Sequence, residues 1–364
     1  MKVLIIRYKK SGKVLEGGEQ CSTRNYNVIA SLVGDSNVDT YFVHDETRRR
    51  SLFEYLRGVW YFPRNYYFGL TPRRVSEICR KAENYDVVWV DRSIFGIVAK
   101  KLKQNGYKGR VIAFFHNVET MYFDAKLKKN LPFRNVVIGC ADSNDSYVCR
   151  YADCVVALNE RDNSELKKRY NRAADVLAPI AFADKYQRES YTDALTDKKP
   201  LCLFLGGYFT ANNEGIEWFV KNVLPHVNIR FRIVGKGMEK LQGCDWLTPD
   251  IELVPNAPEL LPHFEEADMM VLPIFKGGGM KVKTCESLMY GKNILATDES
   301  WEGYNIDCRR AGGRCNTAQD YIDRINEIIA NPIPKFNTYN RQIFLDNYSE
   351  DAVRDLFRKA LDLQ

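Results

Sequence analysis

Short runs of apolar residues recur along the whole chain, and they alternate with stretches whose apolar positions follow helical spacing. β-branched and aromatic residues fill these runs, which is typical of strands in a parallel sheet covered on both faces. In the first half, helices are predicted over residues 22–34 and 94–106, and Gly106 marks the end of the second. Strands are predicted there over residues 2–6, 39–44, 85–90, 110–116 and 153–159.

The second half repeats this alternation after a polar stretch, residues 182–199, which we interpret as a linker. Strands that alternate with helices favour an α/β fold. The simplest architecture is then two doubly wound, Rossmann-like domains that face each other across a central cleft. The predicted strands of the second half are residues 201–207, 229–237, 251–256, 268–274 and 293–297.

Length and composition agree with two ordinary globular domains. The chain has 364 residues, which is longer than a domain with a single hydrophobic core usually is. Apolar residues make up 45% of it. The formal net charge of +6 is mildly basic. This charge suits anionic small molecules or an anionic membrane surface, whereas a nucleic-acid-binding face would need a denser basic cluster. We therefore expect no nucleic-acid partner.

Cysteine usage and the apolar runs bear on the compartment. The ten cysteines form no C-x-x-C pair and no zinc-binding spacing, which favours free thiols in a reducing cytoplasm. The opening "MKVLIIRYKK" is predicted to be a strand rather than part of a signal peptide. No apolar run approaches the roughly 18 residues that cross a bilayer. We expect a cytoplasmic protein that is soluble or peripheral on the inner face of the membrane.

Candidate ligand-binding positions follow from the predicted strands. In doubly wound sheets, ligands bind beyond the carboxyl ends of the strands. His116 ends one predicted strand, and a loop with Gly17 and Gly18 follows the first strand. The corresponding positions of the second half are Gly206, Gly207, Gly235, Lys236, Gly237 and the three glycines 277–279. We expect these positions to converge on one cleft.

The glycine run opens the most informative segment, "GGGMKVKTCESLMYG" (277–291). The glycines allow the backbone to approach a ligand, and the helix predicted after them presents free N–H groups to an anion. Lys281 and Lys283 add two positive charges, which suit a diphosphate. Glu286 lies three residues after Lys283, on nearly the same helix face, where it is suited to accept hydrogen bonds from a ribose diol. The segment therefore predicts a site for a nucleoside diphosphate.

Residues 277–304, "GGGMKVKTCESLMYGKNILATDESWEGY", closely resemble the donor-site segment of an enzyme family. This family is the family 4 retaining glycosyltransferases of the GT-B fold, in which basic residues stand five and three positions before a glutamate. Lys281 and Lys283 have this spacing to Glu286. Further resemblances cover most of the chain, in "LFLGGYFTANNEGIEWFVKNVLP" (203–225), "FRIVGKG" (231–237), "LPHFEEADMMVLPI" (261–274), "FFHNVETMYF" (114–123) and "ADCVVALNERDNSELKKRY" (152–170).

The resemblance implies that the two domains bind different substrates. Residues 1–185 would bind the acceptor, and residues 186–345 would bind the nucleotide-sugar. Residues 346–364 would form a helix that crosses back to the first domain, and Val353, Leu356, Phe357, Ala360 and Leu361 give it an apolar stripe. The implied activity is transfer of a sugar to a glycan or lipid-linked acceptor in cell-surface polysaccharide synthesis, with retention of anomeric configuration. UDP is a more typical donor base in the family than GDP, and no metal or other cofactor is expected.

The resemblance also implies site residues. His116 would contact the transferred sugar and, with Lys281, Lys283 and Glu286, act in catalysis. Asn117, Glu119 and Arg24 would contact the acceptor, although Arg24 is equally interpreted as a solvated charge. The donor would be bound by Gly17, Gly18, Gly206, Gly207, Gly235, Lys236, Gly277, Gly278, Gly279, Met280, Lys281, Lys283 and Glu286. Glu302 and Gly303 would border the donor sugar.

One departure from the family pattern leaves alternatives open. Many members carry a second glutamate eight residues before the one matched by Glu286, and this chain has Gly278 there. That glutamate usually lies near the ring hydroxyls of the transferred sugar, so its absence puts the identity of the sugar in doubt. The alternatives are a non-catalytic partner that binds nucleotide-sugar or glycan, and another enzyme of this fold, such as a nucleotide-sugar epimerase or a phosphorylase.

Residues 55–74 combine aromatic and basic side chains in an unusual density. Amphipathic aromatics beside arginines suit a membrane interface with anionic headgroups, where a lipid-linked acceptor would be found. The alternative is an aromatic-rich segment that packs on its own domain.

Overall fold

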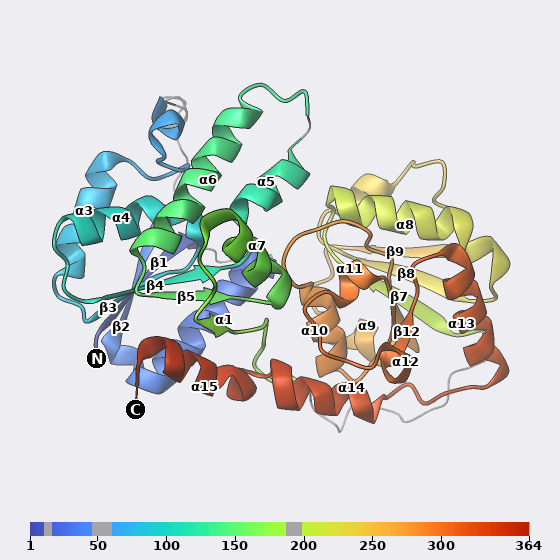
Figure 1. Cartoon of the computed structure of the whole chain (residues 1–364). Coiled ribbons are helices and arrows are strands. Elements are labelled where there is room, and N and C mark those ends of the chain that lie inside the picture. The colour runs from blue at the N-terminus through green and yellow to red at the C-terminus, as the bar shows by residue number, and fades with distance from the viewer. Residues whose placement is uncertain (11–16, 46–59, 128, 187–198, 364) are drawn as a thin grey trace. The chain divides into compact units, whose positions relative to one another are not determined.

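A computed structural model describes residues 1–10, 17–45, 60–127, 129–186 and 199–363. The chain divides into two compact units, the first made of Met1–Ala181 with Glu350–Gln364 and the second of Phe182–Ser349 (Figure 1). The divisions at 181 and 349 compare with expected boundaries at 185 and 345. The chain therefore leaves the first unit once and returns to it for its final helix.

The first unit is built on a six-stranded sheet of order β2-β1-β3-β4-β5-β6, in which every strand pair is parallel. Two of its inner strands, "VVWV" and "CVVA", are buried along their whole length, as continuous apolar runs in a parallel sheet require. The strands are β1 (Val3–Lys10), β2 (Val38–Asp45), β3 (Val87–Val90), β4 (Arg110–Phe115), β5 (Cys154–Ala157) and β6 (Val176–Leu177).

Helices cover both faces of this sheet, with α4 and α6 on one side and α1 and α15 on the other (Figure 1). Local capping fixes several of their starts. Thr71 accepts a hydrogen bond from Arg74 N ahead of α3, and Asn159 accepts one from Asp162 N ahead of α7. The helices are α1 (Gly17–Val33), α3 (Pro72–Ala82), α4 (Gly96–Gln104), α5 (Glu119–Lys126), α6 (Arg134–Tyr151), α7 (Glu160–Tyr170) and α15 (Glu350–Leu361).

The second unit repeats the design with a parallel sheet of order β12-β11-β10-β7-β8-β9. Its strands are β7 (Leu201–Leu205), β8 (Arg230–Gly235), β9 (Ile251–Pro255), β10 (Met269–Leu272), β11 (Asn293–Ala296) and β12 (Gly312–Arg314). Its helices are α8 (Thr210–Asn222), α9 (Leu261–Glu266), α10 (Val282–Met289), α11 (Asp298–Trp301), α12 (Cys308–Ala311), α13 (Ala318–Ala330) and α14 (Thr338–Ile343). Ring contacts of Tyr321 with Trp218 and Phe219 pack α13 against α8, and Phe264 stacks on Tyr290 between α9 and α10.

The predicted α/β class and all ten predicted strands are confirmed. The two strands that were not predicted, β6 and β12, have only two and three residues, too few for an apolar run to stand out. One prediction was wrong. α1 begins at Gly17, so Gly17 and Gly18 form the first turn of a helix and not a loop.

The final helix, α15, packs into the core of the first unit. Val353, Phe357, Ala360 and Leu361 are buried, and the ring of Phe357 stacks on that of Trp89 with centroids 5.3 Å apart. Arg110 Nε donates a hydrogen bond to Ala360 O at 3.2 Å. The first unit therefore depends on residues that lie after the whole second unit in sequence.

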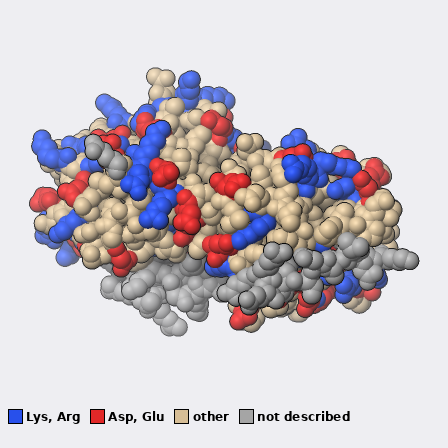
Figure 2. All heavy atoms as spheres, turned by 90° about the horizontal axis from the view of Figure 1, so that it is seen from below, with Lys and Arg blue, Asp and Glu red and all other residues tan. Residues whose placement is uncertain are grey.

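Charged side chains of both signs are interspersed on the face shown in Figure 2. This agrees with a composition of 53 basic and 47 acidic residues. None of the ten cysteines, all of which the structure describes, forms a disulfide. Within the described parts of the chain, no helix has the length and apolar character needed to cross a membrane.

Candidate active site

The glycine-rich segment connects the end of β10 to the start of α10 and presents both predicted lysines. Gly279 adopts φ +57°, a left-handed conformation that favours glycine. Met280 is buried beneath this loop, and Lys281 takes the N-cap position of α10 in extended geometry. The loop thus places Lys281 and Lys283 within the first turn of α10, as the sequence predicts.

Lys281 is held by groups from three parts of the second unit. Its Nζ donates to Gly279 O at 3.0 Å and forms an ion pair with Glu299 Oε1 at 2.6 Å. Tyr304 Oη donates to Lys281 O at 2.7 Å. Only 11% of the Lys281 side chain is exposed. Its ammonium group is therefore preorganised, and its pairing with Glu299 must weaken if an anionic ligand is to share it.

The charge of Lys281 is paired with a carboxylate, whereas Lys283 contacts a neutral amide. Its Nζ donates to the neutral amide oxygen Asn212 Oδ1 at 2.6 Å and lies 4.5 Å from the centroid of the Phe204 ring. Burial, with a contribution from the charge of Lys281, lowers the pKa of Lys283 to about 7, and the charge of Glu286 opposes this shift only in part. An anionic ligand would supply Lys283 with a counter-charge and favour its protonated form.

The end of β7 borders Lys283, and the end of β8 approaches the end of β7. A Cβ on Gly206 would stand 2.9 Å from Asn212 Nδ2 and 3.1 Å from Lys283 Nζ, and Asn212 Nδ2 also donates to Gly207 O at 2.8 Å. A Cβ on Gly235 would overlap Gly206 O. Glycine is therefore required where the two strand ends approach each other, and the structure brings Gly206, Gly207 and Gly235 together with the lysines.

Other predicted donor residues vary in position. Glu286 lies one turn after Lys283 on α10 and is half-buried, close enough to affect the pKa of Lys283. Gly277 and Gly278 are exposed at the start of the loop. The Lys236 side chain points to solvent, while its carbonyl accepts a hydrogen bond from Tyr208 N at 2.8 Å. The donor contact of Lys236 stays a prediction.

In the first unit, His116 belongs to a buried polar cluster at the ends of β3 and β4. Its Nε2 lies 3.5 Å from Asp91 Oδ2, and Asp91 Oδ1 accepts hydrogen bonds from Asn25 Nδ2 at 2.7 Å and Trp89 Nε1 at 3.1 Å. Burial would lower the pKa of His116, but the charge of Cys21 and the interaction with Asp91 raise it to about 9. Burial would raise the pKa of Asp91, but His116, Asn25 and Ser22 lower it to about 2. The pair is an imidazolium and a carboxylate at neutral pH.

Three further predicted residues, Gly18, Glu119 and Asn117, border this cluster. A Cβ on Gly18 would overlap the Arg92 guanidinium, whose Nη2 lies 3.4 Å from Glu19 Oε1. Glu119 is buried at the start of α5, and burial raises its pKa while Arg92 and His116 act against this shift. Asn117 is half-buried between His116 and α5. These residues lie around His116 as a contiguous polar group.

Arg24 requires a correction. It is 1% exposed and therefore is not a solvated charge. Its Nη1 donates to Pro179 O at 2.8 Å, and its guanidinium lies 5.6 and 5.1 Å from the ring centroids of Phe114 and Phe357. These contacts explain Arg24 as a structural residue beneath α15, so we do not include it among the proposed acceptor contacts.

Residues 60–74 are the described part of the aromatic and basic segment, and some of their side chains are packed while others are exposed. Tyr66 and Tyr67 pack against the hydrophobic core of the first unit, and Arg74 Nη1 donates to Val43 O and Gly69 O. Trp60, by contrast, is 67% exposed and lies 5.1 Å from the Arg64 guanidinium. Residues 55–59 lie outside the described residues.

Several polar residues of these sites were not predicted from the sequence, among them Asp91, Asn212 and Glu299. Asp91 follows β3 directly, so the rule on strand ends would have identified it. Asn212 and Glu299 stand in the first turns of α8 and α11, after the ends of β7 and β11. Their proximity to Lys283 and Lys281 depends on the order of strands in the sheet, which no local signal encodes.

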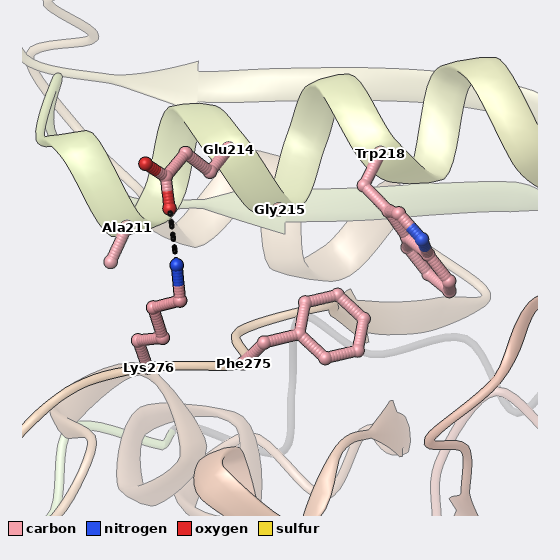
Figure 3. A pocket seen from close by; sticks show the side chains of 6 residues that line it. All are labelled: Ala211, Glu214, Gly215, Trp218, Phe275 and Lys276. Carbon is pink, nitrogen blue, oxygen red and sulfur yellow. Dashed lines mark ion pairs between the residues drawn. The ribbon is translucent and has the colours of Figure 1, made fainter.

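A small pocket of about 240 Å³ lies beside the start of the glycine run, residues 277–279 (Figure 3). Trp218 and Phe275 meet edge to face with centroids 4.6 Å apart, and Lys276 pairs with Glu214 at 3.8 Å. The remaining lining residues are Ala211 and Gly215, and a Cβ on Gly215 would overlap Pro273 O. These contacts fix α8 against the segment that leads into the glycine run.

Among the described residues, no group of three or more histidine, cysteine, aspartate or glutamate side chains is placed to hold a metal ion.

The Asp91–His116 pair provides a test of the first-unit cluster. Asp91→Asn is expected to lower the free energy of unfolding by about 3 kcal/mol, because it leaves a buried imidazolium without its counter-charge. The raised pKa of His116 means that its stabilising effect is complete below pH 6.5 and is lost as pH rises through about 9. The lowered pKa of Asp91 means that its effect is present above pH 3.8 and is lost as pH falls through about 2.

The difference between wild type and Asp91→Asn should therefore be largest between pH 3.8 and 6.5 and should shrink toward pH 9. Urea unfolding at several pH values measures it, and Glu83→Gln, an exposed carboxylate of the same unit, is the control. A difference that stays constant from pH 5 to pH 9 would contradict the proposed coupling.

We compared the chain with known protein families, sequences and structures. Residues 199–331 match the family model described as "Glycosyl transferases group 1". This match covers most of the second unit, including the glycine run, both lysines and Glu286. No curated protein sequence matches the chain.

Several solved structures share the fold over the full length of the chain. The lipopolysaccharide outer core galactosyltransferase WaaB aligns with a TM-score of 0.65 and 12% identity, covering 100% of this chain and 99% of that one. Anabaena HepE in complex with UDP aligns with a TM-score of 0.68 and 12% identity, covering 100% of both chains. An α,α-trehalose 6-phosphate synthase from Burkholderia multivorans aligns with a TM-score of 0.64 and 12% identity, covering 99% of this chain and 96% of that one. At this identity the likeness establishes the two-domain GT-B fold.

Proposed function

We propose that this glycosyltransferase, whose second unit is a group 1 glycosyltransferase domain in a GT-B fold, moves a sugar from a nucleotide diphosphate to a saccharide acceptor with retention of configuration. UDP is the proposed base, because the similar HepE structures contain UDP or UDP-glucose. The proposed acceptor is a glycan or a lipid-linked saccharide of the cell surface, and the similar outer core galactosyltransferase supports this choice.

The observation that carries the proposal is the pair of lysines at the start of α10. Lys283 lies beside Gly206 at the end of β7 and Lys281 lies beside Gly277. Burial, together with the charge of Lys281, lowers the pKa of Lys283 to about 7, and Glu286 opposes this shift only in part. The first turn of α10 adds N–H groups and a partial positive charge in the same place. A diphosphate supplies the negative charge and the acceptor oxygens that this arrangement lacks.

Glu286 is proposed to accept hydrogen bonds from the ribose of the donor. Glu286→Ala is then expected to weaken UDP binding by about tenfold, the loss of one charge-assisted hydrogen bond, and to leave pyrophosphate binding unchanged. Isothermal titration calorimetry with the two ligands measures both effects. An equal loss for UDP and pyrophosphate would place Glu286 away from the ribose.

For the chemical step, we propose that the departing phosphate accepts the proton of the acceptor hydroxyl on the face from which it leaves. Lys281, Lys283 and the N-terminus of α10 would stabilise the growing negative charge on that phosphate. Glu286 would contribute indirectly, because its hydrogen bonds to the ribose would position the donor. The resemblance assigns His116 to the transferred sugar and Asn117 and Glu119 to the acceptor, and these assignments stay predictions.

This mechanism uses lysines where other transferases use a divalent cation, so EDTA is expected to leave the turnover rate nearly unchanged. The rate of donor consumption is measured with and without EDTA, and with added Mg²⁺ or Mn²⁺. A strict requirement for either ion would contradict the proposed mechanism.

We propose that the protein works in the cytoplasm, with a peripheral contact to the inner membrane face. Trp60 and Arg64 support this contact, because an exposed indole beside a guanidinium suits an interface with anionic headgroups. Co-sedimentation with vesicles that contain anionic lipid, with and without Trp60→Ala, tests the contact.

The proposed function itself is tested in two steps. A panel of UDP- and GDP-sugars in a thermal-shift assay identifies the donor, and turnover is then measured with and without saccharide acceptors. NMR of the product gives its anomeric configuration. A change of the donor sugar without an acceptor would identify an epimerase. Donor binding without turnover on any acceptor would favour the non-catalytic partner, for which the glycine at position 278 is the supporting observation.

A further inference from the structure

The donor loop lacks an acidic side chain of its own, and a carboxylate from another part of the chain occupies the space beside it. Glycines fill positions 277–279, so these three positions carry no side chain that could contact a donor sugar. Glu299, on the short helix α11 after β11, extends its carboxylate to this loop.

The geometry of this contact is tight. A Cβ built on Gly277 would lie 3.2 Å from Glu299 Oε1 and 3.1 Å from Lys281 Nζ, so the ion pair occupies the volume that a side chain at position 277 would take. The Glu299 side chain is 17% exposed. Its carboxylate therefore stands at the protein surface of the loop, partly open to a ligand.

The position of Glu299 is fixed by hydrogen bonds of its helix. Thr297 caps α11 through Ser300 N and donates to Ile274 O in the segment after β10. Ser300 Oγ donates to Leu272 O at 2.8 Å, and Thr284 Oγ1 of α10 donates to Ser300 O at 2.8 Å. These buried bonds connect α11 to the end of β10 and to the start of α10. Glu299 is thus held by the same elements that hold the two lysines.

Binding of a nucleotide-sugar would change the charges around Glu299. If Lys281 binds the diphosphate, the Glu299 carboxylate loses part of its counter-charge while an anion arrives nearby. A half-buried carboxylate in that situation needs hydrogen-bond donors. The group attached to the diphosphate is a sugar, and its hydroxyls are such donors.

Resting on the proposed function, we propose that Glu299 is the sugar-recognising acid of the donor site. Its carboxylate accepts hydrogen bonds from ring hydroxyls of the transferred sugar, in place of an acidic side chain at Gly278. In the structure the same carboxylate pairs with Lys281. Glu299 would then contribute to selecting the sugar, and Lys281 and Lys283 would bind the diphosphate common to all donors.

The experiment compares nucleotide with nucleotide-sugar. Affinities for UDP, UDP-glucose, UDP-galactose and UDP-N-acetylglucosamine are measured by calorimetry for wild type and Glu299→Ala. The variant should bind the preferred UDP-sugar about tenfold or more weakly. It should bind UDP as tightly as wild type or more tightly, because Lys281 is released from its ion pair. Asp298→Ala, an exposed carboxylate of the same helix that pairs with Arg314, should change neither affinity.

A second variant tests whether the two positions serve one function. Gly278 is not among the glycines with positive φ, so a side chain fits its backbone conformation. The double variant Gly278→Glu with Glu299→Ala should regain part of the UDP-sugar affinity.

Three results would overturn the inference. Equal weakening of UDP and UDP-sugar by Glu299→Ala would show that Glu299 only positions Lys281. No change for either ligand would show that it contributes nothing to binding. A double variant as weak as Glu299→Ala alone would show that positions 278 and 299 do not serve the same group. Wild-type protein that binds none of the four ligands would instead reject the proposed function, and this inference with it.

Discussion

Lys283→Ala is expected to weaken binding of a nucleoside diphosphate by tenfold or more. A charge-assisted hydrogen bond contributes about 1.5–3 kcal/mol, and each 1.4 kcal/mol is a factor of about ten in affinity. Because the same charge would stabilise the departing phosphate, turnover should fall further than affinity. Calorimetry with UDP and steady-state rates with the identified donor give the two numbers.

The matched control is Lys276→Ala. This lysine precedes the glycine run, is 80% exposed and pairs with Glu214. A tenfold effect in both variants would indicate general attraction of the anion, and unchanged affinity in Lys283→Ala would remove Lys283 from the donor site.

The same lysine should make donor binding depend on pH. Burial and Lys281 lower the pKa of Lys283 to about 7, so the amine of the empty site is largely neutral at pH 9. A diphosphate favours the charged amine, and binding above pH 7 must therefore include proton uptake. Affinity should be constant below pH 7 and fall above it by up to about tenfold per pH unit.

UDP-sugars are suitable probes for this dependence, because their diphosphate has no terminal phosphate that titrates near pH 6. Lys283→Met retains the length of the side chain without its charge, and its affinity should be low and independent of pH. A wild-type affinity that is also constant from pH 7 to pH 9 would contradict the lowered pKa of Lys283.

Phe357→Ala is expected to destabilise the first unit by about 3–5 kcal/mol, although it changes the last helix of the chain. The Phe357 ring is 1% exposed, stacks on Trp89 and lies 5.1 Å from the Arg24 guanidinium. Removing it leaves a cavity beside β3 and β4. Hydrogen exchange of the amides of β3 and β4 reports this loss in the first unit alone, whatever the second unit does.

Asp355→Ala, on the same helix and 94% exposed, is the control for this effect. Removal of all residues after Ser349 should have a larger effect in the same peptides. If the shortened chain retains the exchange protection and turnover of wild type, α15 is dispensable for the first unit.

The candidate site was predicted unevenly, and the difference has a physical cause. The glycine run, Lys281, Lys283 and Glu286 are consecutive in sequence, so a strand followed by a loop and a helix N-terminus was enough to assign them to an anion. Glu299 and Asn212 contact these lysines from the first turns of helices that follow other strands. Their place depends on β10 lying between β7 and β11 in the sheet. Arg24 shows the opposite case, because its charge suggested a solvated or ligand-binding residue, whereas the structure buries it against Phe114 and Phe357.

The sequence by itself determined the α/β class, the position of ten strands and the placement of glycines, Lys281, Lys283 and Glu286 between a strand and a helix. These features are local, since apolar runs, glycines and closely spaced charges act within one strand or one turn of helix. Tertiary structure alone decided that His116 is paired with Asp91, that Lys283 is buried enough to have a pKa of about 7, and that Glu299 occupies the space beside Gly277. Burial and pairing between distant residues arise when parallel strands align their carboxyl ends, and only the order of the strands determines which side chains meet there.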